Sequence, residues 1–468
     1  MQIAPRQLDA LTAAGACLLA IGLGAVLHAG GLAWIAATVG ITVFLFAVIV
    51  GISAALDDPT RIPFALAAVG IALASANGVR VSQFTAGDVL LLASAPVYLV
   101  LLRRLPRLPT WLWAGAGLIT ASALLIALFP PPLSSSELFR QKNLTSGQVA
   151  QEPHLVLAAR LLLAVIVIPA VIAVAASTAN RLRWLVTFWV VGTALGAFIA
   201  VLAAFGPVDL QQTITGQAYT IEAYKLTQGR YTGLSVHPTL LGVAAAMACP
   251  VVIGRMTDVR KGWIYSPVFA VLVLAVLVSG SRIALIAAIV GMAVVFVYQH
   301  RTRRQALAIA AAAGLLLTFT GSAASGLSTT QRLFKDAGGV ESAASSDASR
   351  SRTIREGIEL FQQRPIGWGY QGLRGAHNVL IQILSGGGLL LLLGMGLVVG
   401  GAMVAGWRLR AEADAVGLLA SVVVVLVAGT TTNAVFDRFL SIPVGLLVGL
   451  SLVALQSQTI PDETSGIG

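Results

Sequence analysis

The sequence predicts an all-α polytopic membrane protein. Hydrophobic residues make up 57% of the 468-residue chain and charged residues only 10%, whereas soluble domains carry about 25% charge. The mean hydropathy is +0.88. Apolar runs of about 20 residues, the length that a helix needs to cross the hydrocarbon core, recur along the chain. Helices are expected because an open sheet would leave backbone groups unpaired in lipid.

Fourteen apolar runs are candidate membrane spans, and the short ones at 62–78 and 441–457 are the weakest, so we expect a bundle of about 12–14 helices. We treat residues 1–468 as one integral membrane domain whose first run is a retained anchor rather than a cleaved signal peptide. The runs are 9–28, 33–55, 62–78, 84–102, 110–129, 154–178, 185–206, 237–256, 264–280, 283–298, 306–322, 385–406, 415–432 and 441–457.

The loops between these runs predict an orientation. Short basic loops gather on the cytoplasmic side of membrane proteins. With fourteen spans, that rule also places both termini in the cytoplasm. The short basic loops are 103–107, 181–183, 255–261, 301–304 and 408–410. The longer loops, at 130–153, 207–236 and 323–384, are then expected on the outer face.

The net charge of +11 has three possible kinds of partner: nucleic acid, lipid headgroups or an anionic substrate. Many basic residues fall in the predicted outer loops, including Arg355 and Arg374. A positive surface beside a membrane suits an anionic headgroup or a diphosphate, and nucleic acid is not expected on that face. A solvated loop of mixed charge is the alternative for any single arginine.

The outer loop 323–384 contains a predicted surface helix. Its small polar segments are expected to be flexible. Thr353 and Glu356 have capping-box spacing, and Pro365 ends the pattern. One helical face then carries the apolar residues Ile354, Ile358 and Phe361. We therefore expect an amphipathic helix lying on the outer surface.

Two motifs place arginine next to a predicted span on the outer side. GRYTGLSVHPTLLG, at 229–242, contains Arg230 and then His237, followed by a proline that suits a first helical turn. LVSGSRIALIAAIVG, at 277–291, leaves almost no loop around Arg282. A guanidinium so close to hydrocarbon needs a partner or water, and its planar fork fits phosphate oxygens. The alternative for both arginines is snorkelling to headgroups.

The third motif is LRGAHNVLIQILSGGGLL, at 373–390. The 28 residues from His377 to Val404 would form a helix of about 42 Å, which exceeds a core of about 30 Å. The three glycines at 386–388 predict a break, which leaves 377–385 as a short interfacial helix before the true span. A helix N-terminus disfavours imidazolium, and a neutral His377 is the form that accepts a proton. Asn378 either caps that helix or contacts a sugar.

Other polar residues give weaker signals. Asp88 is a candidate partner for Arg160, and Asp437 either orients a base or binds an acceptor, or pairs with Arg438. Both cysteines, Cys17 and Cys249, lie in apolar runs and are expected to be buried rather than to form a disulfide. No His or Cys cluster has zinc-ligand spacing, and GxGxxG, P-loop and HExxH patterns are absent, so no metal and no cofactor are expected.

Taken in order, GRYTGLSVHP, SGSR and REGIELFQQRPIGWGYQGLRGAHN resemble the O-antigen ligase/O-antigen polymerase superfamily of bacterial membrane glycosyltransferases, over about residues 225–405. Ligases of this superfamily resemble proteins with twelve membrane spans, fewer than the fourteen candidate runs in this sequence. The resemblance implies a lipopolysaccharide-type reaction at the outer face of the inner membrane. An undecaprenyl-type polyprenyl diphosphate donates a glycan to a hydroxyl of a lipid or glycan acceptor, such as the lipopolysaccharide core, without a metal.

The resemblance also implies residue roles. Arg230 and Arg282 match arginines that hold the diphosphate, and His377 matches the general base. The residues expected around the substrates are His237, Arg355, Arg374, Asn378 and Asp437. The motifs leave a polysaccharide polymerase of the same superfamily open. A transporter is the third hypothesis, but repeated halves and helices broken at mid-membrane are not evident in the sequence.

Overall fold

The fold is described from a computed structural model. The described residues are 61–81, 84–101, 106–131, 154–205, 230–256, 262–299, 304, 306–308, 311, 340–370, 378–432 and 437–458. Sequence predictions for the spans 9–28 and 33–55, and for most of 306–322, lie outside these ranges.

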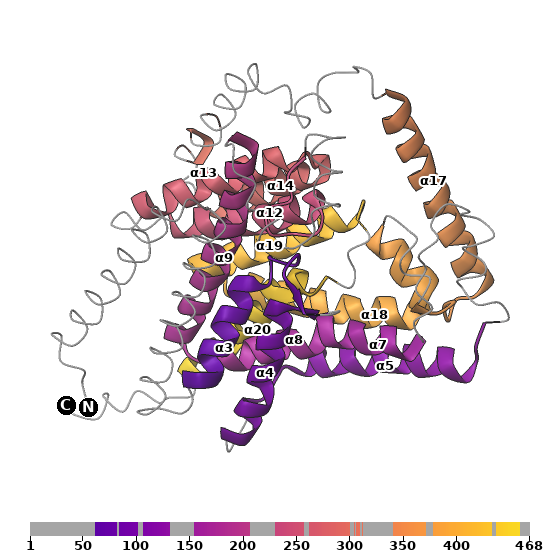
Figure 1. Cartoon of the computed structure of the whole chain (residues 1–468). Helices are drawn as coiled ribbons and strands as arrows, with labels where there is room; N and C mark the ends of the chain where they lie inside the picture. The colour runs from indigo at the N-terminus through magenta and orange to yellow at the C-terminus, as the bar shows by residue number, and fades with distance from the viewer. Residues whose placement is uncertain are drawn as a thin grey trace.

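The described chain is a bundle of α-helices (Figure 1). Within the described residues, regular β structure is limited to a short antiparallel pair, β1 (Arg80–Val81) with β2 (Phe84–Thr85). The helices are α3 (Arg61–Leu73), α4 (Ala86–Leu101), α5 (Thr110–Leu128), α7 (His154–Leu162), η1 (Leu163–Val167), α8 (Ile168–Ala175), α9 (Ala179–Phe205), α12 (Pro238–Arg255), α13 (Gly262–Val278), α14 (Arg282–Tyr298), α17 (Val340–Gln363), α18 (Val379–Arg408), α19 (Ala413–Gly429), η4 (Arg438–Ser441) and α20 (Ile442–Gln458).

Length and composition allow membrane crossing by five helices of the described part: Thr110–Leu128, His154–Ala175, Ala179–Ala204, Pro238–Arg255 and Val379–Arg408. The described residues also contain six shorter apolar helices. An α-helix satisfies its own backbone hydrogen bonds, which is what the hydrocarbon core demands. The predicted class, an all-α protein with several membrane spans, is confirmed.

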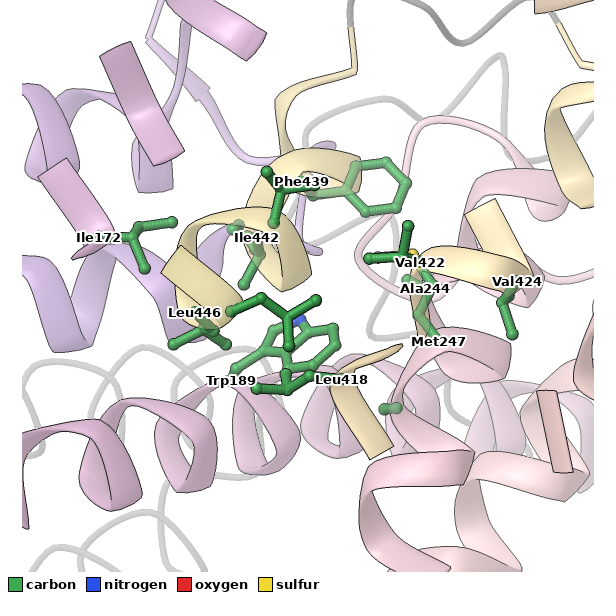
Figure 2. Close-up of a cluster of buried hydrophobic side chains, with 14 of the residues drawn as sticks. Ile172, Trp189, Ala244, Met247, Leu418, Val422, Val424, Phe439, Ile442 and Leu446 are labelled. Atoms are coloured by element: carbon green, nitrogen blue, oxygen red, sulfur yellow. The ribbon is translucent and has the colours of Figure 1, made fainter. Parts of the chain in front are cut away.

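The core is one large cluster of apolar side chains that many of the helices contribute. Figure 2 shows Trp189 of α9 among Met247 of α12, Leu418 of α19 and Leu446 of α20. Trp189 is 1% exposed, and the other three are fully buried or nearly so. Close packing of this kind, rather than the hydrophobic effect, holds helices together where lipid is the solvent. Cys249 of α12 also lies buried in this core, as predicted.

The direction of each central helix follows from its contacts. Ser421 of α19 donates to the backbone carbonyl of Met247 on α12 (2.5 Å), and a Cβ on Gly417 would lie 2.7 Å from Cα of Val251. Residue numbers therefore rise along α19 as they fall along α12, so these helices are antiparallel. The end of α19 consequently lies beside the start of α12.

The contacts of α14 and α18 bring their first residues to the same end. A Cβ on Gly242 of α12 would lie 2.8 Å from Cβ of Ala284 on α14, so these two helices start together. Asn378, just before α18, donates from Nδ2 to the carbonyl of Thr430, just after α19 (3.0 Å). We call the end at which α12, α14 and α18 begin the capped end. The opposite end carries an ion pair between Arg255 and Asp414 at 2.9 Å.

Helix α17 differs from the surface helix that the sequence predicts. It runs without interruption from Val340 to Gln363, so Thr353 and Glu356 are interior positions and the predicted capping box is wrong. The small polar segment at 341–349, expected to be flexible, is helical. Alanine and serine in that segment tolerate a helix well, which composition alone does not reveal.

The buried face of α17 is also not the predicted one. Thr353, Gly357 and Leu360 are buried, whereas Ile358 is 41% exposed. Gly357 allows close approach to α18, because a Cβ there would lie 2.2 Å from Cγ2 of Ile381. The predicted end of the helix is confirmed, since α17 stops two residues before Pro365.

The predicted break in the third motif is confirmed. Gly388 has φ 66° and ψ −160° and interrupts α18, so that a shorter helix from Val379 precedes the longer one. Only glycine adopts this conformation readily. A Cβ on Gly388 would also lie 2.1 Å from the carbonyl oxygen of Pro365.

Replacing Gly388 by alanine will therefore destabilise the protein by about 3 kcal/mol or more, because the backbone strain of about 1–3 kcal/mol adds to a clash with a main-chain atom. Thermal unfolding in detergent measures the effect. The matched control is Gly396→Ala on the same helix, where a Cβ meets nothing within 4 Å, and which should leave the melting temperature unchanged or raise it. Equal melting temperatures for the two variants would contradict this account of the break.

Candidate functional site at the capped end

Each of the three sequence motifs supplies the N-cap of one helix at the capped end. His237 caps α12 through Nδ1, which accepts from the backbone N–H of Thr239 (3.1 Å). Ser281 caps α14 by accepting from the N–H of Ala284 (3.4 Å). Asn378 caps α18 by accepting from the N–H of Ile381 (3.1 Å). Such caps satisfy backbone donors that the first helical turn leaves unpaired.

Arg230 joins the first motif to the second. Its Nε donates to the carbonyl oxygen of Ser279 (2.9 Å) and its Nη2 to Oγ1 of Thr239 (3.0 Å). The residue is only 8% exposed. A buried guanidinium that donates hydrogen bonds to a turn and to a helix start holds the two together, so Arg230 has a structural role here in addition to its charge.

Arg282 lies at the first position of α14 and is exposed. The turn before it is tight: Gly280 has φ 63°, and Oγ of Ser279 accepts from the N–H of Ser281 (3.3 Å) while donating to the carbonyl of Val276 (2.7 Å). The turn presents Arg282 at the surface of the capped end, and the same turn accepts a hydrogen bond from the buried Arg230 at Ser279.

The segment 230–237 is also held by the residues that follow α3. Ser235 donates to the carbonyl of Ser75 (3.0 Å), and Asn77 accepts through Oδ1 from the N–H of Val236 (2.9 Å). The carbonyl of Leu234 accepts from the N–H of Gly78 (2.8 Å). These bonds fix the chain that carries Arg230 and His237.

Asn378 caps α18, which is one of the two roles that the sequence left open. Its Oδ1 accepts from Ile381 and its Nδ2 donates to Thr430, so both ends of the amide have partners in the fold. His377, its neighbour in the sequence, and Arg374 lie outside the described residues.

The remaining predicted residues are spread over other elements. Arg355 is exposed on α17, and Asp437 occupies the N-cap position of η4 without a side-chain capping bond. Arg438, a candidate partner of Asp437, donates from Nη1 to Oδ2 of Asp88 (2.5 Å). Asp88 also forms a capping box with Thr85 at the start of α4. The partner of Asp88 that the sequence suggested was Arg160, so the ion pair with Arg438 is a correction.

Arg230, Arg282 and three helix starts lie at the capped end. A helix N-terminus carries the equivalent of about half a positive charge and exposes N–H groups, which makes it suited to anions. Here three N-termini, of α12, α14 and α18, lie at one end together with Arg230 and Arg282. Such an arrangement can hold a diphosphate and stabilise charge that develops on it. Among the described residues, no group of three or more His, Cys, Asp or Glu side chains is placed to hold a metal ion.

The sequence predicted helix starts at His237-Pro238 and at His377-Asn378, but the cap that Ser281 forms on α14 was missed. The signal was present, because His-Pro, Ser-Arg and His-Asn each immediately precede an apolar run, and Ser and Asn are common caps. The sequence does not show that α12, α14 and α18 begin at the same end of the bundle, because that arrangement depends on packing against α19.

The fold defines a multi-pass α-helical membrane protein with two arginines and three helix starts at its capped end. Residues 267–396 match the family model described as O-antigen ligase. The match supports the O-antigen ligase superfamily and confirms the resemblance drawn from the motifs, and it points to an enzyme of the membrane glycosyltransferase type. It includes Arg282, His377 and Asn378 and begins after Arg230 and His237. No curated protein matches the chain.

Proposed function

We propose that the protein is a ligase-like glycosyltransferase that moves a glycan from a polyprenyl diphosphate carrier to a hydroxyl of a lipid or cell-envelope acceptor. The observation that carries the proposal is the meeting of three helix N-termini with Arg230 and Arg282 at one end of an apolar bundle. The capped end would face the extracytoplasmic side of the inner membrane. The short basic segments 181–183, at the start of α9, and 408–410, at the end of α18, lie at the opposite end of the bundle, and such segments favour the cytoplasm.

The arginines would act on the leaving group. As the bond between the sugar C1 and the diphosphate oxygen breaks, its electron pair stays with that oxygen, and negative charge grows on the diphosphate. Arg282 reaches this charge from the surface, and Arg230 adds a fixed positive charge behind the turn. Charge-assisted hydrogen bonds from guanidinium groups stabilise such an oxyanion without a metal.

His377 would act on the acceptor. The acceptor hydroxyl attacks C1 on the face opposite the diphosphate, which inverts the anomeric centre, and its proton passes to the neutral imidazole. The products are the transferred glycan, the polyprenyl diphosphate and a protonated histidine that then loses its proton to water. Arg355, Arg374, His237, Asn378 and Asp437 are proposed to line or shape the substrate cleft.

Transfer in vitro tests the proposal. Purified protein in detergent should move a glycan from a polyprenyl diphosphate donor to a lipopolysaccharide-core acceptor, and an excess of chelator should leave the rate unchanged. Mass spectrometry of the product and release of the carrier diphosphate are the measurements. Strict dependence on a divalent ion would contradict the mechanism.

The same assay separates the polymerase alternative. If carrier-linked glycan alone is the acceptor and the product is a longer carrier-linked chain, the protein is a polymerase. In cells, loss of a ligase leaves long polymer on the carrier, whereas loss of a polymerase leaves single repeat units.

A further inference from the structure

The break in α18 is closed by a separate turn of the chain. Residues Pro365–Tyr370, which we call the docked turn, lie against Ser385–Leu389. The N–H groups of Trp368 and Gly369 donate to the carbonyls of Ser385 (2.9 Å) and Gly386 (2.8 Å). In return, the N–H of Leu389 donates to the carbonyl of Pro365 (3.0 Å).

These bonds replace the ones that the helix loses at Gly388. Ser385, Gly386 and Gly387 are all buried, and an unpaired buried backbone group costs about 1–3 kcal/mol. Two of the three carbonyls are satisfied by the docked turn. The third, of Gly387, accepts from Oγ of Ser122 on α5 (2.7 Å). The broken conformation of α18 therefore depends on the docked turn and on α5.

Tyr370, the last residue of the docked turn, is fully buried and holds the turn in place. Its hydroxyl lies 3.3 Å from both Oγ of Ser122 and the carbonyl of Ile119 on α5. Burial raises the pKa of Tyr370 to about 12, and the hydrogen bond to Ser122 opposes that rise. The phenol is therefore protonated at neutral pH, as a donor must be.

His154, the first residue of α7, completes the attachment. Its Nδ1 lies 3.2 Å from the backbone nitrogen of Tyr370, which donates to it, so the neutral ring carries its proton on Nε2, which lies 3.1 Å from the carbonyl of Ala123 and donates to it. The imidazole and phenol rings also pack at 4.9 Å between centroids. One imidazole thus ties the docked turn to α5, the helix that lies along α18 (Figure 1).

The consequence concerns the N-terminal half of α18. The chain is fixed at Tyr370 by His154 and Ser122, and fixed again at Asn378 by Thr430. Arg374 and His377 belong to the seven residues between these two points. The attachment also sets where the helix from Val379 to Gly387 lies relative to the rest of α18.

We propose that His154 and Tyr370 are positioning residues that hold the docked turn in the break of α18 and so orient the helix start that follows His377. The proposal deepens the function proposed above and rests on it for its kinetic consequence. Neither residue need touch substrate, because both act through the backbone of the break.

The structural test uses the full-length protein in detergent with Cys17 and Cys249 replaced by serine and alanine. Spin labels are placed at Leu380 and Leu393, which are 51% and 49% exposed and lie on either side of the break. His154→Ala should broaden the distance distribution between the labels. His154→Asn, whose amide oxygen can accept from the N–H of Tyr370, should restore most of the narrow distribution. If the distance distribution of the His154→Ala variant is as narrow as that of the unaltered protein, the proposal is overturned.

The kinetic test uses the same variants in the transfer assay. Loss of orientation should lower kcat at least tenfold while KM for the carrier-linked donor changes less than twofold, and His154→Asn should recover part of kcat. The control is Thr120→Val on α5, whose exposed hydroxyl bonds only its own helix, to Ala116, and which should change neither readout. A broad distance distribution with unchanged kcat rejects the positioning role.

The two proposals fail in different ways. If the unaltered protein transfers no glycan, the proposed function fails, while the distance measurement still decides whether His154 holds the break. If the unaltered protein transfers glycan and His154→Ala changes neither distance nor kcat, the function stands and the positioning proposal fails.

Discussion

Replacing His377 by alanine will lower the rate of glycan transfer by about 10²–10⁴-fold, the contribution typical of a positioned general base. The acceptor hydroxyl would have to lose its proton to water as it attacks C1. Binding of the carrier-linked donor should remain, because the diphosphate contact proposed for Arg282 and the fixed charge of Arg230 are untouched. Single-turnover transfer with excess enzyme, compared with donor binding, measures the two effects separately.

Two further measurements separate loss of a base from loss of fold. Added imidazole should restore part of the activity of His377→Ala. The matched control is Asn378→Ala, which removes a helix cap worth about 1 kcal/mol but leaves the imidazole, and which should lower the melting temperature more than His377→Ala does. Transfer by His377→Ala at the unaltered rate would remove this residue from the mechanism.

Replacing Arg282 by glutamine will lower kcat by about 10²–10³-fold, the usual effect of removing one donor to a developing oxyanion. The side chain is exposed at the first position of α14, and its removal leaves the Ser281 cap and the bond from Arg230 to Ser279 in place. The melting temperature should therefore change little. The rate of release of the carrier diphosphate is the measurement.

Arg282→Lys and Arg304→Gln complete the test. Lysine keeps the charge but loses the planar fork, so it should retain only part of the activity. Arg304 is also exposed but follows α14 at its other end, and its replacement should have no effect on transfer. If Arg304→Gln and Arg282→Gln slow transfer equally, net charge rather than the geometry of the capped end is responsible.

The amino-acid sequence by itself determined the class of the protein and the identity of the candidate residues. Apolar runs of spanning length require helices whatever their neighbours are, because lipid offers the backbone no hydrogen bonds. The break at Gly388 was also predictable, since the run after His377 is too long for one crossing and contains three adjacent glycines. The order of the motifs gave the family resemblance.

Local rules failed where packing decides between similar alternatives. Thr353 and Glu356 have the spacing of a capping box but lie inside α17, because the alanines and serines before them also form helix. Gly357 rather than an isoleucine faces α18, since close approach of two helices favours the smallest side chain. Asp88 pairs with Arg438, 350 residues away in the chain, and nothing in the sequence marks that partner.

Only the tertiary structure decided how the candidate residues meet. The bond from Arg230 to the carbonyl of Ser279 crosses 49 residues, and that from Asn378 to Thr430 crosses 52. Long-range contacts of this kind depend on which way neighbouring helices run and on which small residues let them approach, and these are properties of the packed bundle. The sequence therefore supplied three caps and their basic neighbours, and packing against α19 brought them to one end.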